Sequence, residues 1–190
     1  MLSRKSYLIL ILLSSMILAA GVVPAADFTP QNSPDNLKAL FKKLHAAMTA
    51  QDDKTAAALA KPLFPDEARL RKALRDNVSA EAVKAILNQQ ADFLKSTPAA
   101  RIFAAKPENT EVLVFKATTE EIAQYKEGTM AFQEFPGGTR RLAETVLRPG
   151  LTFYEVSLVK PGERSGMKFH LFYWDGQGWA MVGPAWRVIK

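Results

Sequence analysis

The sequence contains no cysteine among its 190 residues and only two histidines, His45 and His170. Without thiols it can form neither a disulfide nor a cysteine-based metal site, so the fold must be held by its apolar core. Two histidines on separate segments, and acidic residues whose spacing matches no calcium loop, argue against a metal centre. A glycine-rich phosphate-binding loop is also lacking. We therefore expect neither a metal nor another cofactor.

Long basic tracts are absent as well. The 25 Lys and Arg against 19 Asp and Glu give a net charge of +6, which becomes about +4 once the basic residues of the first segment are set aside. The excess is spread over small groups such as Lys42-Lys43 and Arg140-Arg141. A nucleic-acid surface is typically a dense basic stripe with aromatics among it. We therefore expect no nucleic-acid partner.

The first 25 residues have the pattern of a secretory signal peptide. Arg4 and Lys5 precede an apolar run over residues 7–20, and the small residues Val23 and Ala25 place a cleavage site before Ala26. The pattern predicts export to the periplasm or the extracellular space, with no stable membrane insertion after cleavage. An uncleaved membrane anchor is the alternative, because the apolar run approaches the ~18 residues of a spanning helix.

The mature chain is predicted to consist of a spacer at 26–36 and a single domain at 37–190. Helix-start signals occur at Ser33-Pro34, Asp52-Asp53, Pro65-Asp66 and Ser79. The first half of the mature chain is therefore predicted to be helical.

After residue 107 the pattern changes. Residues 111–118 alternate like a strand, and Thr118 and Glu121 form a capping box for a short helix ending at Gly128. Residues 130–135 are interpreted as a second strand, and 140–147 as a helix. Strands follow at 152–159, 167–174 and 179–182, joined by turn sequences. Helices in the first half and an antiparallel sheet in the second predict an α+β fold, with the N-terminal helices packed on the sheet.

Alternation along the two long terminal strands predicts which side chains share a face. The expected core face carries Tyr154, Val156, Leu158, Phe169, Leu171 and Tyr173, and the other face carries Phe153, Glu155, Ser157, Lys168, His170, Phe172 and Trp174. A hairpin centred near Glu163-Arg164 would set Ser157 opposite His170 and Glu155 diagonal to it.

This register yields the candidate catalytic residues. An imidazole suits proton transfer at neutral pH, so His170 is the candidate general base, with Glu155 or Asp175 as its partner. Ser157 lies in mid-strand rather than at a strained turn, which argues against a nucleophilic triad. The alternative for His170 is a structural, half-buried histidine bonded to a neighbour.

Aromatic side chains gather near the C-terminus. Trp174 and Trp179 bracket a four-residue turn, and Trp186 follows closely. With Phe153 and Phe172 they form a candidate surface for a ligand or a protein partner, because tryptophan is favoured at binding surfaces. The alternative is that the pair across the turn only stabilises the hairpin end.

Two stretches resemble the NTF2-like (cystatin-like α+β) superfamily: residues 37–63, a helix with an Ala-rich continuation, and residues 169–186, with a Trp-Asp-Gly-x-Gly-Trp turn. The resemblance covers under half of the mature chain, and the helices at 65–95 are additional to the family pattern. It implies a curved sheet wrapped round a long helix to form a cone with a pocket. Such folds include dehydratases, isomerases and many non-catalytic binding modules.

These observations predict an exported, non-catalytic domain that binds a small apolar ligand or a protein partner. The alternative is a small NTF2-like enzyme of the isomerase, dehydratase or hydrolase type. A pocket of ~300 Å³ or more, lined by His170, Glu155 and aromatics, would favour a ligand site. A filled core would favour a protein-interaction role.

Overall fold

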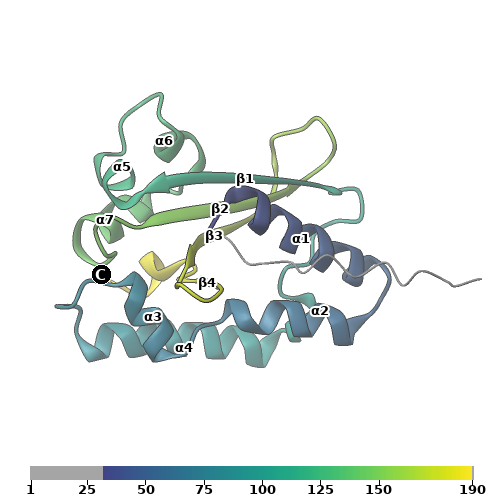
Figure 1. The fold of residues 1–190 in the computed structure, drawn as a ribbon, viewed down its shortest axis with the longest axis horizontal. Helices are drawn as coiled ribbons and strands as arrows, with labels where there is room; N and C mark the ends of the chain where they lie inside the picture. Colours follow the sequence, from purple (N-terminus) through teal and green to yellow (C-terminus); the bar gives the residue numbers. More distant parts are fainter. Residues whose placement is uncertain (1–31, 190) are drawn as a thin grey trace, which may run out of the picture.

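A four-stranded antiparallel sheet forms the centre of the fold. The computed structural model describes residues 32–189. The strands are β1 (Glu111–Thr118), β2 (Thr152–Val159), β3 (Gly166–Trp174) and β4 (Trp179–Met181), and they pair in chain order (Figure 1). This order is that of a meander. The prediction of an α+β fold, with N-terminal helices and a C-terminal sheet, is confirmed.

Four helices precede the sheet and begin where the sequence predicts. They are α1 (Pro34–Thr49), α2 (Asp53–Ala60), α3 (Glu67–Ala73) and α4 (Ala80–Ser96). Their N-cap side chains, Ser33, Asp52, Asp66 and Ser79, each accept a backbone N–H of the first turn. These bonds satisfy donors that a helix leaves unpaired at its start. Two short 3₁₀ turns, η1 (Lys61–Leu63) and η2 (Ala99–Arg101), also belong to this region.

Three short helices lie between β1 and β2, grouped at one end of the strands (Figure 1): α5 (Thr119–Gln124), α6 (Met130–Glu134) and α7 (Gly138–Thr145). The predicted capping box of Thr118 and Glu121 is confirmed, although α5 ends at Gln124 instead of Gly128. The predicted helix near 140–147 is confirmed as α7. The predicted strand at 130–135 is wrong, because Thr129 caps a helical turn there.

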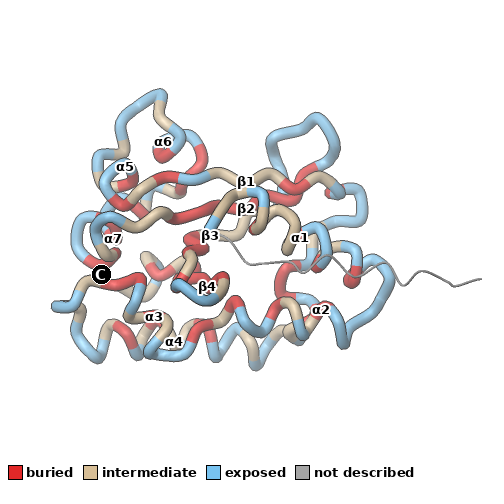
Figure 2. The backbone as a smooth tube through the Cα atoms, viewed as in Figure 1, coloured by how far each residue is buried: buried red, intermediate tan, exposed pale blue. Residues whose placement is uncertain are grey.

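Both faces of the sheet are covered, so β2 is buried from Phe153 to Val159 (Figure 2). On one face, Tyr154, Val156 and Leu158 share a core cluster with residues of α1 and α2. On the other face, Phe153 packs in a cluster with residues of α3, α5 and α7. A strand that is buried on both sides carries no simple apolar alternation.

The predicted division of β3 between the two faces is wrong beyond His170. Val156 pairs with Phe169 and Tyr154 pairs with Phe172, so Glu155 lies opposite two residues of β3. This is a β-bulge, and its second residue, Leu171, has a positive φ of 57°. Because of the extra residue, the side chains from Leu171 onward point to the faces opposite to those predicted. Leu171 and Tyr173 join the Phe153 cluster, while Phe172 joins the Tyr154 cluster.

The predicted signal peptide lies outside the described residues. Among residues 32–189, no helix has the length and apolar character needed to span a membrane.

Candidate functional site

A cleft opens beside the unpaired half of β3. The short strand β4 pairs only with β3 residues 172–174, so no described strand covers residues 166–170 on that side. The space there amounts to about 340 Å³. Its lining comes from segments between η1 and the C-terminal end: Phe64, Gln89, Gln90, Phe93, Ile102, Phe103, Met167, Lys168, Phe169, His170, Met181, Gly183, Pro184 and Arg187.

Aromatic rings form much of this lining and fix its shape. The Phe103 ring lies 5.3 Å from that of Phe41, 6.0 Å from Phe64 and 5.1 Å from Phe169, measured between centroids. Phe103 is buried, so these contacts hold a rigid apolar wall. Phe93 and Met167, by contrast, are 44% and 47% exposed. The cleft therefore offers apolar surface that a ligand could remove from water.

His170 and Glu155 form a pair behind the cleft. A hydrogen bond of 2.6 Å joins His170 Nδ1 to Glu155 Oε2, and the Leu171 N–H donates to Glu155 Oε1 at 3.2 Å. The imidazole also packs edge-on to Trp186, with 5.3 Å between centroids. The Glu155 side chain is fully buried, while that of His170 is 22% exposed and lines the cleft. The bulge creates this pairing by placing His170 directly opposite Glu155.

Burial dominates the electrostatics of this pair. Removal from water raises the pKa of the Glu155 carboxyl, because a charge is costly in a low-dielectric interior. The hydrogen bonds from His170 and the Leu171 N–H act in the opposite direction and only partly offset this effect on the pKa. Glu155 orients the imidazole through Nδ1. In residues 32–189, the other ring nitrogen, Nε2, makes no hydrogen bond.

Two further cations line the cleft, and they differ in their partners. Lys168 Nζ lies 2.9 Å from Glu134 Oε2 and also donates to the backbone oxygen of Glu134. Burial alone would raise the pKa of Glu134, but the hydrogen bonds from Lys168 and Arg164 outweigh it and lower the pKa. Arg187 is exposed, and although its backbone N–H donates to the Pro184 oxygen, its guanidinium makes no hydrogen bond or ion pair with any described residue.

Two neighbouring glutamines of α4 complete the polar lining. Gln90 is buried and donates from Nε2 to the backbone oxygens of Met181 and Val182, at 3.0 and 3.3 Å. These bonds tie α4 to the chain that leaves β4. Gln89 Oε1 is buried without a partner in the described part of the chain. A buried acceptor on a cleft wall provides a hydrogen-bonding position for a ligand.

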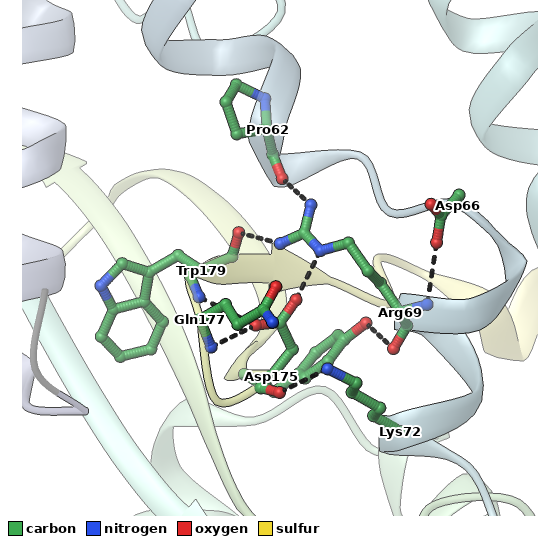
Figure 3. A network of polar contacts seen from close by, with 9 residues as sticks. Pro62, Asp66, Arg69, Lys72, Asp175, Gln177 and Trp179 are labelled. Carbon is green, nitrogen blue, oxygen red and sulfur yellow. Dashed lines mark hydrogen bonds and ion pairs between the residues drawn. The ribbon is translucent and has the colours of Figure 1, made fainter.

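Asp175 lies away from His170, in a network that joins α3 to the turn between β3 and β4 (Figure 3). Its Oδ2 accepts from Arg69 Nε, and its Oδ1 accepts from the N–H groups of Gln177 and Gly178 at 2.8 Å. Arg69 also donates to the backbone oxygens of Pro62 and Trp179. The structure therefore gives Asp175 a structural role, and it does not bring Asp175 together with His170.

Ser157 does not join the pair either. It is opposite Lys168 in the observed register, and its hydroxyl has no hydrogen-bond partner among the described residues. The predicted register, which set Ser157 opposite His170, was therefore wrong. Of Ser157, Glu155, His170 and Asp175, the structure brings only Glu155 and His170 together.

The aromatic candidates are divided between core and surface. Phe153 and Phe172 are fully buried on opposite faces of the sheet, and Trp179 is 5% exposed, so these three are core residues and not a surface. Trp174 and Trp179 do pack across the turn as predicted, with 5.5 Å between centroids. Trp186 contacts His170 instead of these two. None of the five lines the cleft.

A second hollow of about 340 Å³ lies at the N-terminal end of β3, against the loop from β2, and shares Met167 with the cleft. Polar and charged side chains dominate its lining, which includes Lys106, Glu108, Lys160 and Glu163. Its rim presents both signs of charge to water. The cleft with the phenylalanines is the better candidate for an apolar ligand.

Sequence reasoning did not single out Phe93, Phe103, Gln90 or Arg187. Two signals existed in α4. Gln90 occupies the stripe of Val83 and Ile86, where an apolar residue is expected, and Phe93 is an exposed aromatic. For Phe103 and Arg187 the sequence offers no such signal, because their place in the cleft depends on contacts between distant segments.

The chain was compared with protein-family models, curated proteins and solved structures. No protein-family model, curated protein or solved structure matches this chain.

Proposed function

We propose that this protein is an exported, non-catalytic binding domain that takes a small, largely apolar ligand in the cleft beside β3. The observation that supports this most is the combination of volume and lining. The cleft measures about 340 Å³, within the ~300–1,000 Å³ range of small-molecule sites. Phenylalanine, methionine and isoleucine side chains form most of its apolar wall.

The exposed side chains at the cleft favour its interpretation as a ligand site and argue against a mere packing defect. Phe93 and Met167 keep nearly half of their surface in water although both line the cleft. A ligand seated there would bury this surface, at ~25 cal/mol per Å². The resemblance to the NTF2-like superfamily, which implies a ligand pocket, fits the same proposal.

Binding of a neutral apolar dye tests the site. Phenylnaphthylamine is expected to bind the protein saturably, with an increase in its fluorescence. Replacing Phe93 or Met167 with Gln removes apolar contact and should weaken dye binding about tenfold, since ~1.4 kcal/mol corresponds to a factor of ten. Phe132→Gln is the matched control, because Phe132 is also an exposed phenylalanine, 43% accessible, but lies on α6 outside the cleft.

Two results would contradict the proposed site. One is the absence of saturable binding to the unsubstituted protein. The other is an equal loss of dye affinity in Phe132→Gln and Phe93→Gln, which would mean that the dye adheres to exposed apolar side chains in general. Unfolding curves for all variants should coincide within about 1 kcal/mol, because the substituted side chains are half exposed.

The export part of the proposal has its own test. Cleavage before Ala26 predicts that the mature protein, isolated from its native source, begins at Ala26 or Asp27. N-terminal sequencing measures this directly. A product that begins at Met1 would contradict cleavage and favour the uncleaved anchor.

An enzyme is the second candidate, and the pair of Glu155 and His170 is the observation that favours it. A buried carboxylate that holds Nδ1 of an imidazole, with the ring lining a cleft, is the arrangement of a general base. The fate of the natural ligand separates the two candidates. A compound extracted with the protein and recovered unchanged after incubation supports binding alone, whereas its conversion, lost in His170→Gln, supports the enzyme.

A further inference from the structure

We propose that the ligand of this cleft is an amphipathic anion: an apolar body seated against the phenylalanines, with a carboxylate or similar head group bound by Arg187 and by Nε2 of His170. This inference rests on the proposed function, because it names the chemical class of ligand for the same cleft. Two observations support it: the ionisable side chains of the lining are all basic, and one of them, Arg187, has a side chain without a partner among the described residues.

The described lining of the cleft contains basic side chains and no acidic ones. Lys168, His170 and Arg187 are its only ionisable side chains, and no carboxylate appears in the lining that the structure describes. The nearby carboxylates are already engaged. Glu155 is fully buried behind His170, and Glu134 is paired with Lys168 and Arg164. A cleft of this kind attracts an anion and disfavours a cation.

Arg187 is the cation that remains available. The Lys168 ammonium already has partners, because it donates to Glu134 Oε2 and to the Glu134 backbone oxygen, each 2.9 Å away. The Arg187 guanidinium has no hydrogen bond or ion pair within residues 32–189, and the residue lies in the 3₁₀ turn η3 (Ala185–Arg187) at the cleft. A guanidinium presents a planar fork of donors that matches a carboxylate in two-point contact. Arg187 therefore supplies the main contact to the head group.

His170 provides the second contact. Glu155 holds Nδ1, so the ring orientation is fixed and Nε2 is left to a ligand. When Nε2 carries its hydrogen, it donates to an anionic oxygen. His170 acts here as a binding residue, which differs from the proton-transfer role that an enzyme would require.

Two dyes with the same aromatic body test the inference. Anilinonaphthalenesulfonate carries a sulfonate that phenylnaphthylamine lacks, so the difference between their affinities isolates the head group. We expect the unsubstituted protein to bind the sulfonate about tenfold more tightly. Arg187→Gln should remove this preference and change the affinity for the neutral dye by less than about twofold. Added salt should weaken sulfonate binding only, because it screens charge interactions.

Two further variants control for charge in general. Lys126→Gln removes one positive charge from a position outside the cleft, so it should leave both affinities unchanged. Arg187→Lys keeps the charge without the planar fork and should restore part of the preference.

The outcomes separate this inference from the proposed function. If neither dye binds saturably, the ligand site itself is wrong, and the inference falls with it. If both dyes bind equally and Arg187→Gln alters neither affinity, the cleft binds apolar ligands but the anion is wrong. Equal losses for both dyes in Arg187→Gln would also overturn the inference, since they would give Arg187 a structural role.

Discussion

Replacing Asp175 with Asn is expected to lower the free energy of unfolding by about 3 kcal/mol at pH 7, which is the scale for breaking a buried ion pair from one side. The Asp175 side chain is fully buried, and its partner Arg69 is 26% exposed. An asparagine could still accept from Gln177 and Gly178 through its oxygen. Its amide nitrogen would then face Arg69 Nε, and two donors would meet where a charged pair existed.

The loss of unfolding free energy in Asp175→Asn should depend on pH, and the hydrogen bonds to Asp175 determine whether it grows or shrinks as pH falls. Burial alone would raise the pKa of Asp175, but the hydrogen bonds from Arg69, Gln177 and Gly178 outweigh it and lower the pKa. The unfolded chain therefore binds a proton at higher pH than the folded protein does. The stabilisation is complete above the ordinary aspartate pKa and is lost as pH falls through the lowered one.

Denaturant unfolding at pH 7 and at pH 3 measures both effects, with Glu144→Gln as the matched control. Glu144 pairs with Arg140 on the surface of α7, where both side chains are exposed. Surface pairs of this kind contribute ~0–1 kcal/mol, so the control should change little at either pH. A difference between Asp175→Asn and the unsubstituted protein that grows toward pH 3 would contradict the assignment.

The helix starts could be predicted because their causes are local. Ser33, Asp52 and Ser79 cap helices through bonds to residues three positions ahead, and the sequence alone shows that spacing. The six residues from Met130 to Phe135 follow a cap of the same kind, Thr129, but they are too few to show helical periodicity. A short apolar run fits a strand or a helical turn equally well, and the bond from the Phe132 N–H to Thr129 Oγ1 favours the turn.

The bulge at His170 and Leu171 could not be predicted, because its cause is a contact between strands. The Leu171 N–H donates to the buried Glu155, and Leu171 O accepts from the Val182 N–H. These bonds hold a leucine at positive φ, which the residue does not favour by itself. Strict alternation therefore assigned the wrong face to Leu171, Phe172 and Tyr173.

The candidate pair was nevertheless identified from the sequence, while the cleft was not. Glu155 and His170 lie on adjacent strands of one hairpin, so their proximity follows from pairing within a short segment. The cleft combines residues near η1, α4, the chain after η2, β3 and the C-terminal segment. Packing of Phe103 against Phe41, Phe64 and Phe169 positions these parts, and such long-range contacts have no signature in local sequence.

Replacing His170 with Ala is expected to lower the free energy of unfolding by about 3 kcal/mol at pH 8, because it leaves the fully buried Glu155 carboxylate without its side-chain partner. His170→Gln should cost no more than about 1 kcal/mol, since a glutamine amide can donate to Glu155 Oε2. The two variants thus separate loss of the hydrogen bond from loss of the imidazole.

The same variants carry a pH signature. Burial raises the pKa of Glu155 above its unfolded value, so the unfolded chain releases this proton first and stability falls as pH rises between the two values. Removing His170 takes away an interaction that opposes the rise in pKa. The loss in His170→Ala should therefore be larger at pH 8 than at pH 5, where the buried carboxyl can keep its proton.

A double-mutant cycle with Glu155→Gln tests whether the buried charge is the cause. The substituted amide would be neutral, could accept from the Leu171 N–H and could donate to His170 Nδ1, so Glu155→Gln alone should change stability by less than about 1 kcal/mol. In that background His170→Ala should cost about 1 kcal/mol, and the pH dependence of its loss should disappear. An undiminished loss of about 3 kcal/mol in the Glu155→Gln background would assign the effect to packing of the ring against Trp186 instead.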